Sequence, residues 1–140
     1  MIQFKKILCP TDFSEPSLEG LRYAIELART FEAELCLVHI SPIFVLPPDG
    51  AIGVTPVATG ATETLRTESA HRLDELAAQW IPATIRHTQR LGVGAAAPEI
   101  VRLAEEENAD VIVIATNGET AIWFLGQWRN RPCARRIARC

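Results

Sequence analysis

The fold is decided by ILCPTDFSEP, residues 7–16, where an apolar run ends in a proline and enters a polar turn. Ser14 is a good helix N-cap, and Glu15 suits the first turn of a helix. The order predicts a strand over residues 4–9, a polar loop and a helix. In open α/β sheets, ligands bind at the carboxyl ends of strands, where the winding direction switches. Asp12 is therefore a candidate ligand-binding carboxylate, with helix capping as the alternative.

The rest of the chain alternates between strand-like and helix-like segments. Apolar runs of strand length predict strands covered on both faces, and a more polar one predicts an edge strand. The predicted strands are 4–9, 34–40, 84–88 (the polar one) and 110–115, with a turn at Gly92 and Gly94. Helical spacing of apolar residues predicts helices over 18–31, 61–80 and 97–108, and a last helix follows the fourth strand. This alternation predicts a parallel, doubly wound sheet.

Length and composition predict one globular domain. The chain has 140 residues, of which 48% are hydrophobic and 22% charged, and a net charge of −3. This charge gives no basic face for nucleic acid, and no apolar run approaches the ~20 residues that span a membrane. The start of the chain lacks the features of a signal peptide, so we expect a cytoplasmic protein. Cys9 and Cys36 lie in apolar runs and are expected to be buried and reduced, and no cluster has metal-ligand spacing.

A long segment rich in proline and glycine, residues 41–60, separates the second strand from the next helix. Its composition predicts a loop without regular structure. Loops of this length in a small domain are generally functional or mobile. Two interpretations stay open: the loop covers a site beside Asp12, or it is a surface excursion.

Three motifs together resemble the universal stress protein family. They are CPTDFS at residues 9–14, LVHI at 37–40 and APEIVRLAEEENADVIVI at 97–114, and the resemblance runs from about residue 4 to 118. It implies a three-layer α/β/α sandwich of the Rossmann or flavodoxin-like type, with strand order 3-2-1-4 and a fifth strand after the last helix. Members are induced under stress, are usually homodimers and often bind ATP or another adenine nucleotide.

The resemblance also implies a nucleotide site. Its base and ribose part would be lined by Pro10, Thr11, Asp12 and Ile40. In nucleotide-binding members a glycine pattern follows the fourth strand, where backbone N–H groups approach phosphates. The matching residues here are Ala115, Thr116, Asn117, Gly118, Gly126 and Gln127. Ala115 replaces the first glycine, Gly126 follows after seven residues rather than nine, and Gln127 replaces a hydroxyl residue. The base end therefore matches the family, and the phosphate end departs from it.

The end of the chain, residues 127–140, is basic and lacks the fifth strand of the family, which is therefore missing or altered. One hypothesis is a frameshift. Residues 125–130 can be encoded as CTG GGT CAG TGG CGG AAC, which reads Gly-Ser-Val-Ala-Glu, the usual continuation, from the third base. Family dimers commonly form through the fifth strand. Self-association is still expected, but the usual dimer is in doubt and the edge of the fourth strand is left uncovered.

Two functions fit these observations, and catalysis is not expected. The first is a stress-responsive sensor or regulator that binds ATP, AMP or another adenine nucleotide without a required metal. The alternative is an interaction module that binds protein partners and no nucleotide. The histidines His39, His71 and His87 have no partnered nucleophile or carboxylate pair, so the chain is not expected to be an enzyme, although a weak ATPase activity is left open.

Overall fold

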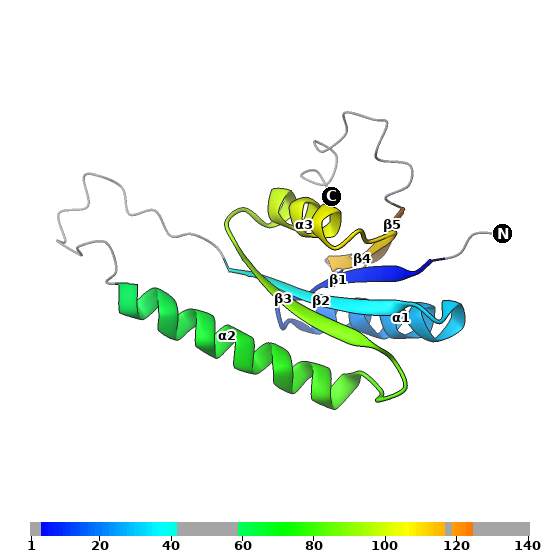
Figure 1. Cartoon of the computed structure of the whole chain (residues 1–140), viewed down its shortest axis with the longest axis horizontal. Coiled ribbons are helices and arrows are strands. Elements are labelled where there is room, and N and C mark those ends of the chain that lie inside the picture. The colour runs from blue at the N-terminus through cyan, green and yellow to red at the C-terminus, as the bar shows by residue number, and fades with distance from the viewer. Residues whose placement is uncertain (1–3, 42–58, 117–118, 125–140) are drawn as a thin grey trace.

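A mixed sheet flanked by helices organises the described part of the molecule (Figure 1). The structure, a computed structural model, describes residues 4–41, 59–116 and 119–124. Its elements are β1 (Lys6–Pro10), α1 (Glu15–Phe31), β2 (Glu34–Ser41), α2 (Thr59–Trp80), β3 (His87–Val93), α3 (Ala96–Glu106), β4 (Val111–Thr116) and β5 (Glu119–Phe124). The strand order is β3-β2-β1-β4-β5, and β1 to β4 are parallel. The predicted parallel sheet with order 3-2-1-4 is confirmed.

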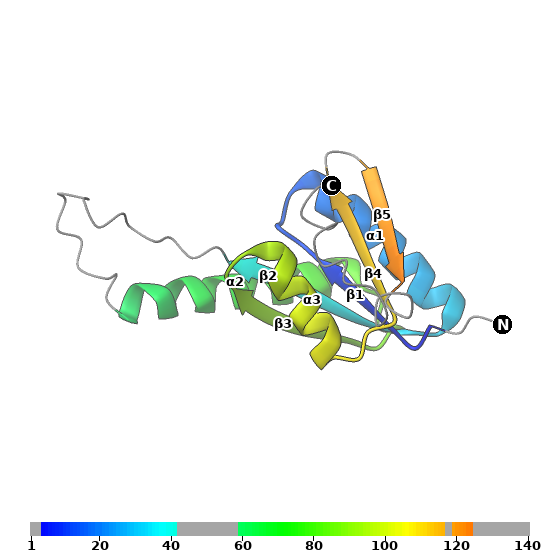
Figure 2. The same ribbon diagram turned by 90° about the horizontal axis from the view of Figure 1, so that it is seen from above.

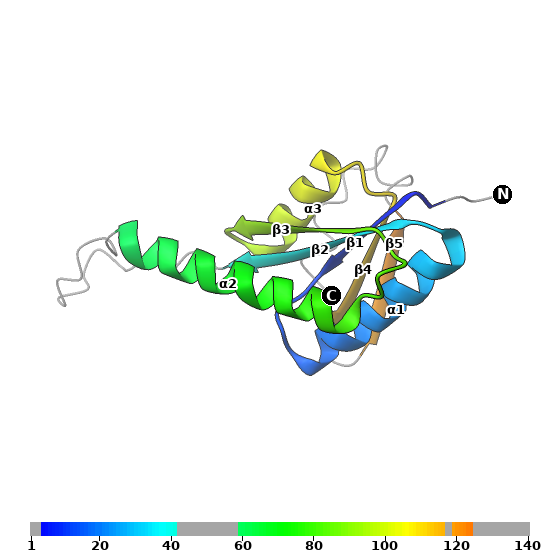
Figure 3. The ribbon, with the colours of Figure 1, turned by 60° about the horizontal axis from the view of Figure 1, so that its bottom comes forward.

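Helices cover both faces of the sheet and make three layers (Figures 2 and 3). Apolar residues of α1 and α2, such as Leu21 and Leu73, pack on one face, and those of α3, such as Leu103, pack on the other. The first half of α2 extends beyond the strands (Figure 2). Leu65 fits the apolar stripe of this helix by spacing, but lies in that projecting half and is 57% exposed.

The β1–α1 unit has the predicted order of strand, polar turn and helix. The Ser14 hydroxyl accepts a hydrogen bond from the Ser17 backbone N–H and caps α1. The helix ends at Glu32, whose φ of 53° is left-handed. Local sequence therefore marks the start of this helix, whereas its end has no glycine or asparagine to signal the left-handed cap.

The third strand lies further along the chain than predicted. β3 begins at His87 rather than at residue 84, and it contains Gly92, which was assigned to a turn. Gly92 pairs with Ile40 of β2, and a Cβ added at residue 92 would lie 2.6 Å from Ile40 Cδ1. The prediction placed a turn here because glycine usually ends strands, whereas this glycine makes room for a neighbour. The predicted edge position of the strand is confirmed.

The prediction of a last helix after the fourth strand is wrong, because a strand, β5, follows β4. β5 runs antiparallel to β4, pairing Thr116 with Glu119 and Val111 with Phe124. Its sequence, ETAIWF, is rich in β-branched and aromatic residues, which favour strands. The outer edge of β4 is thus covered, contrary to expectation, by an altered fifth strand that follows β4 directly. Residues 42–58 of the long loop and residues 125–140, with the basic end, lie outside the described residues.

The two cysteines of the described strands behave as predicted. Cys9 and Cys36 are both buried and free. Burial raises the pKa of the Cys9 thiol to about 12 and also raises the pKa of Cys36. Both side chains are therefore small apolar core groups in the thiol form at neutral pH.

Candidate functional site

The turn between β1 and α1 is held in place by Thr11. The Thr11 backbone N–H donates to the Val38 carbonyl of β2 at 2.7 Å. Its side chain is buried, and Thr11 Oγ1 lies 3.0 Å from Ser17 Oγ and accepts from the Phe13 N–H at 3.1 Å. Backbone and side-chain bonds together give this turn one defined conformation at the carboxyl end of β1.

Asp12 is exposed in this turn and is tied to the start of α1. Its Oδ1 accepts from the Ser14 backbone N–H at 2.9 Å and from the Ser14 hydroxyl. Burial alone would raise the pKa of Asp12. The hydrogen bonds from the hydroxyl and N–H of Ser14, and from the Ser17 hydroxyl, outweigh burial and lower that pKa. The carboxylate is therefore ionised at neutral pH and holds Ser14, which is the residue that caps α1 in place of Asp12.

Phe13 and two neighbours form a stack beside Asp12 that the sequence did not reveal. Phe13 has a left-handed φ of 65°, unusual for an aromatic residue. Its ring lies 4.6 Å from the His39 ring, and the Arg72 guanidinium of α2 lies 4.2 Å from its centroid. His39 Nδ1 is 2.8 Å from the Thr11 carbonyl and donates to it. His39 is therefore a structural residue of this turn, and no local pattern marks Phe13 or Arg72.

Ile40 and Ala115 are each the next-to-last residue of a strand, and their side chains lie on opposite faces of the sheet. Ile40 is half-buried on the α3 face, where it packs on the cluster around Leu103. Ala115 lies on the α1 face, and a Cβ added at Gly20 would lie 3.0 Å from Ala115 Cβ. The methyl group that replaces the first glycine of the family pattern therefore points at α1, where Gly20 leaves space for it.

The predicted site residues within the described part converge on one edge of the sheet. Pro10 ends β1, and Thr11 and Asp12 follow it; Ile40 lies near the end of β2; Ala115 and Thr116 end β4. α1 covers one face beside this edge and α3 the other, so β1 and β4 flank the switch point at which α/β proteins bind ligands. Asn117, Gly118, Gly126 and Gln127 lie outside the described residues.

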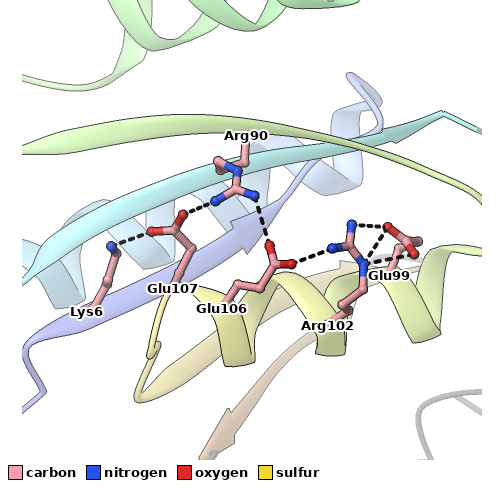
Figure 4. A network of polar contacts seen from close by, with 6 residues as sticks. All are labelled: Lys6, Arg90, Glu99, Arg102, Glu106 and Glu107. Carbon is pink, nitrogen blue, oxygen red and sulfur yellow. Dashed lines mark hydrogen bonds and ion pairs between the residues drawn. The ribbon is translucent and has the colours of Figure 1, made fainter.

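A second polar cluster lies away from this edge and joins α3 to the sheet (Figure 4). The chain of contacts runs through Lys6, Glu107, Arg90, Glu106, Arg102 and Glu99. Lys6 Nζ lies 2.6 Å from Glu107 Oε2, and this hydrogen bond raises the pKa of Lys6 and lowers that of Glu107. Lys6 Nζ also lies 3.6 Å from Glu34 Oε1 of β2, so three cations face four carboxylates in this network, which holds α3 against the sheet.

Three further features of the described residues concern metal sites, membrane-spanning helices and grooves. Among them, no three His, Cys, Asp or Glu side chains gather into a group that could hold a metal ion. None of the described helices is both long and apolar enough to cross a bilayer. A groove of about 330 Å³ is present, but it lies between α2 and β3, away from Asp12.

Comparisons with known proteins agree with this architecture. A model of the universal stress protein family matches residues 3–127. A universal stress protein of Methanocaldococcus jannaschii is 36% identical over 125 residues, which cover 85% of this chain and 68% of that protein. Universal stress protein A homolog 1 of Coxiella burnetii is 29% identical over 118 residues, covering 84% of this chain and 79% of that protein.

Solved structures show the same fold. A member of the universal stress protein family from Burkholderia pseudomallei matches with a TM-score of 0.68 and 25% identity, over 98% of this chain and 92% of that one. A universal stress protein solved in complex with cAMP matches with a TM-score of 0.53 and 20% identity, over 99% and 91%. At the latter identity the likeness concerns the fold.

Proposed function

Because the chain belongs to the universal stress protein family, we propose that it is a cytoplasmic, stress-responsive regulator that binds an adenine nucleotide. The proposed site is the carboxyl edge of β1, β2 and β4. The observation that carries the proposal is the anchored turn that presents Asp12 at the switch point of the sheet. A related protein of the same fold holds cAMP, which supports an adenine nucleotide as the ligand.

The base and ribose end of the site is the part whose residues fit such a ligand. Asp12 is exposed, ionised and fixed in position, so it can accept hydrogen bonds from ribose hydroxyls or from the amino group of the base. Ile40 supplies an apolar group at the neighbouring strand end. Thr11 contributes by holding the turn rather than by contact, because its hydroxyl is already bonded to Ser17 and Phe13.

The phosphate end contributes less to binding in our proposal. Thr116, Asn117, Gly118, Gly126 and Gln127 would lie toward the phosphates, but their pattern departs from that of nucleotide-binding relatives in spacing and in its lack of the hydroxyl residue. Phosphate binding by backbone N–H groups depends on glycines in the right places. We therefore propose that the base and ribose supply most of the binding free energy.

The second candidate function is an interaction module that acts through protein partners without a nucleotide. It is favoured by the β4–β5 connection, because β5 begins three residues after β4 ends and pairs back onto it. The phosphate-binding loop and helix of the family have little room in such a connection. This candidate predicts no adenine nucleotide binding at any concentration near the physiological range.

Purified protein distinguishes the two candidates. Mass spectrometry of the supernatant after denaturation detects any bound adenine nucleotide, and calorimetric titration with ATP up to millimolar concentration measures affinity. We expect saturable binding that Asp12→Asn weakens about tenfold, as loss of a charge-assisted hydrogen bond would. Glu15→Gln removes the same charge from the exposed first turn of α1 and should leave affinity unchanged. Absence of binding at millimolar ATP would reject the nucleotide and favour the interaction module.

A further inference from the structure

The outer edge of β3 presents a row of backbone groups that pair with no other strand among the described residues. The Leu35 N–H donates to the Arg86 carbonyl, and the Gly94 N–H donates to the Ser41 carbonyl, both at 2.9 Å. Even-numbered residues of this strand therefore bond toward β2. The N–H and C=O groups of His87, Gln89, Leu91 and Val93 consequently point away from the sheet, since backbone direction alternates along a strand. Such an edge is a template for pairing with another strand.

The groove of about 330 Å³ runs along this same edge, on the α2 side. It is lined by Arg66, Ala70, Leu73 and Asp74 of α2 and by Gln89, Arg90 and Leu91 of β3. Leu73 is buried at its base, and Arg66 and Asp74 are exposed on its rim. A strand that paired with β3 would bring its own neighbouring helix against an apolar base flanked by one positive and one negative charge.

The charged residues of the groove are arranged so that they would pair with those of a second copy related by a two-fold axis. Ala70 is the middle of the α2 wall, with Arg66 four residues before it and Asp74 four residues after it. Arg90 is likewise the middle of the β3 wall. A two-fold axis through Arg90 and beside Ala70 places Arg66 opposite Asp74 of the second copy, and Asp74 opposite its Arg66. The same axis makes two reciprocal ion pairs, as an isologous interface requires.

The strand register for this axis is also favourable. Pairing two β3 strands antiparallel about Arg90 sets Gln89 opposite Leu91 of the second copy. Both residues have outward-pointing backbone groups, so they form a hydrogen-bonded pair in an antiparallel ladder. α2 lies beneath β2 and β3. With strands ~4.8 Å apart, the two α2 helices would lie about 10 Å apart, which is an ordinary helix packing distance. The small side chain of Ala70 permits that approach.

The Arg90 side chain would meet its own copy at this axis, but its charge is already compensated. On the α3 face, Arg90 Nη2 lies 2.9 Å from Glu106 Oε2, and Arg90 Nη1 contacts Glu107 (Figure 4). These two carboxylates hold the guanidinium toward α3 and compensate its positive charge. Two guanidinium groups that are each paired with carboxylates in this way repel each other weakly, especially at physiological ionic strength.

We propose that the β3 edge and the α2 groove form a homodimer interface, in which two copies join their sheets through antiparallel β3 strands and reciprocal Arg66–Asp74 ion pairs. The occupant of the groove is thus the α2 helix of a second copy. This interface lies on the opposite edge of the sheet from β5 and is independent of nucleotide binding.

Charge exchange tests the interface on the full chain. Sedimentation equilibrium should show a wild-type monomer–dimer equilibrium at micromolar concentration. Arg66→Asp and Asp74→Arg should each weaken dimerisation by at least about tenfold, since each places like charges opposite each other. The double variant should return to within about threefold of the wild type. Glu68→Arg, a charge reversal on the same helix outside the groove, should have no effect.

Hydrogen exchange measured against protein concentration gives a second readout that does not depend on variants. The amides of Gln89 and Leu91 should become protected as the dimer forms, whereas the edge remains open in the monomer. The proposal is overturned by a wild type that stays monomeric, by single variants that dimerise normally, by a double variant without recovery, or by a dimer that leaves these two amides unprotected. A dimer of the last kind would use another surface, such as the β5 edge.

Discussion

The carboxyl ends of β1 and β4 lie side by side but are built by different means. After β1, Thr11 is only 5% exposed, and its backbone and hydroxyl bonds lock the turn that carries Asp12. At the end of β4, the described contact is steric: Ala115 faces Gly20 of α1. A hydrogen-bonded turn tolerates few substitutions, whereas a steric contact is restored by one compensating change. The difference explains how one half of a family site can be kept while the other half departs from its pattern.

The largest difference in the free energy of unfolding should be between a substitution in β1, in the core of the parallel strands, and one in β5. Ile7 of β1 is fully buried, and Ile122 of β5 is 40% exposed. Ile7→Ala should lower the free energy of unfolding by about 2–5 kcal/mol because it leaves a cavity. Ile122→Ala should cost less than about 1 kcal/mol, since its side chain is partly solvated already. Urea unfolding of both variants measures this, and equal losses would mean that β5 is as integral to the core as β1.

Removing the Thr11 hydroxyl should break the hydrogen bonds that hold the turn after β1. Thr11→Val keeps the side-chain shape but takes the acceptor from the Phe13 N–H and the partner from Ser17 Oγ. We expect a loss of about 1–2 kcal/mol in the free energy of unfolding. Thr30→Val is the matched control, because the Thr30 hydroxyl bonds the Glu26 carbonyl on the exposed side of α1. If both variants lose the same stability, the turn is not specially anchored.

The steric contact in the β4 half should respond to paired substitution. A Cβ at Gly20 would lie 3.0 Å from Ala115 Cβ and 3.1 Å from its backbone nitrogen. Gly20→Ala should therefore cost about 1 kcal/mol, after its gain in helix propensity offsets part of the overpacking. Adding Ala115→Gly should recover part of the loss. A double-mutant cycle in urea measures the coupling, and strictly additive effects would contradict the contact.

The charge of Asp12 should have the smallest effect on stability, and it should depend on pH. Its pKa is lowered in the folded state, so its contribution is complete above the unfolded-state pKa of about 3.9 and is lost as the pH falls through the folded-state value. Asp12→Asn should cost less than about 1 kcal/mol at pH 7, because the side chain is exposed. The wild type and the variant should converge once the pH lies below the lowered folded-state pKa of Asp12. A gap that persists there would show that the charge is not its source.

Local signals explain why α1 and the buried strands β2 and β4 could be predicted from the sequence. Ser14 marks the start of α1, and the apolar runs of β2 and β4 mark buried strands without reference to distant residues. β3 was misplaced because its bounds follow from pairing with β2, where Gly92 fits against Ile40. Residues 119–124 carry a short apolar run that suits a helix or a strand equally by periodicity; their β-branched and aromatic residues favour a strand, and pairing with β4 forms it.

In the candidate site, too, the features with a local sequence signal were predicted and those set by packing between elements were not. Pro10, Thr11 and Asp12 were predicted as one turn because a strand end and a helix cap frame them. The stack of Phe13 with His39 and Arg72 joins three elements and depends on a left-handed Phe13, for which the local sequence holds no signal. The direction of Ala115 toward Gly20 likewise follows from the packing of α1 on β4.

The relative affinities for adenosine, AMP and ATP test the central claim most directly. If the base and ribose end supplies most of the binding free energy, calorimetric titrations with Mg²⁺ present should give dissociation constants for ATP and adenosine that differ by less than about tenfold, or 1.4 kcal/mol. ATP that binds more than about tenfold tighter than adenosine would show that the phosphate end holds its ligand after all. That result would contradict the contrast between the two strand ends.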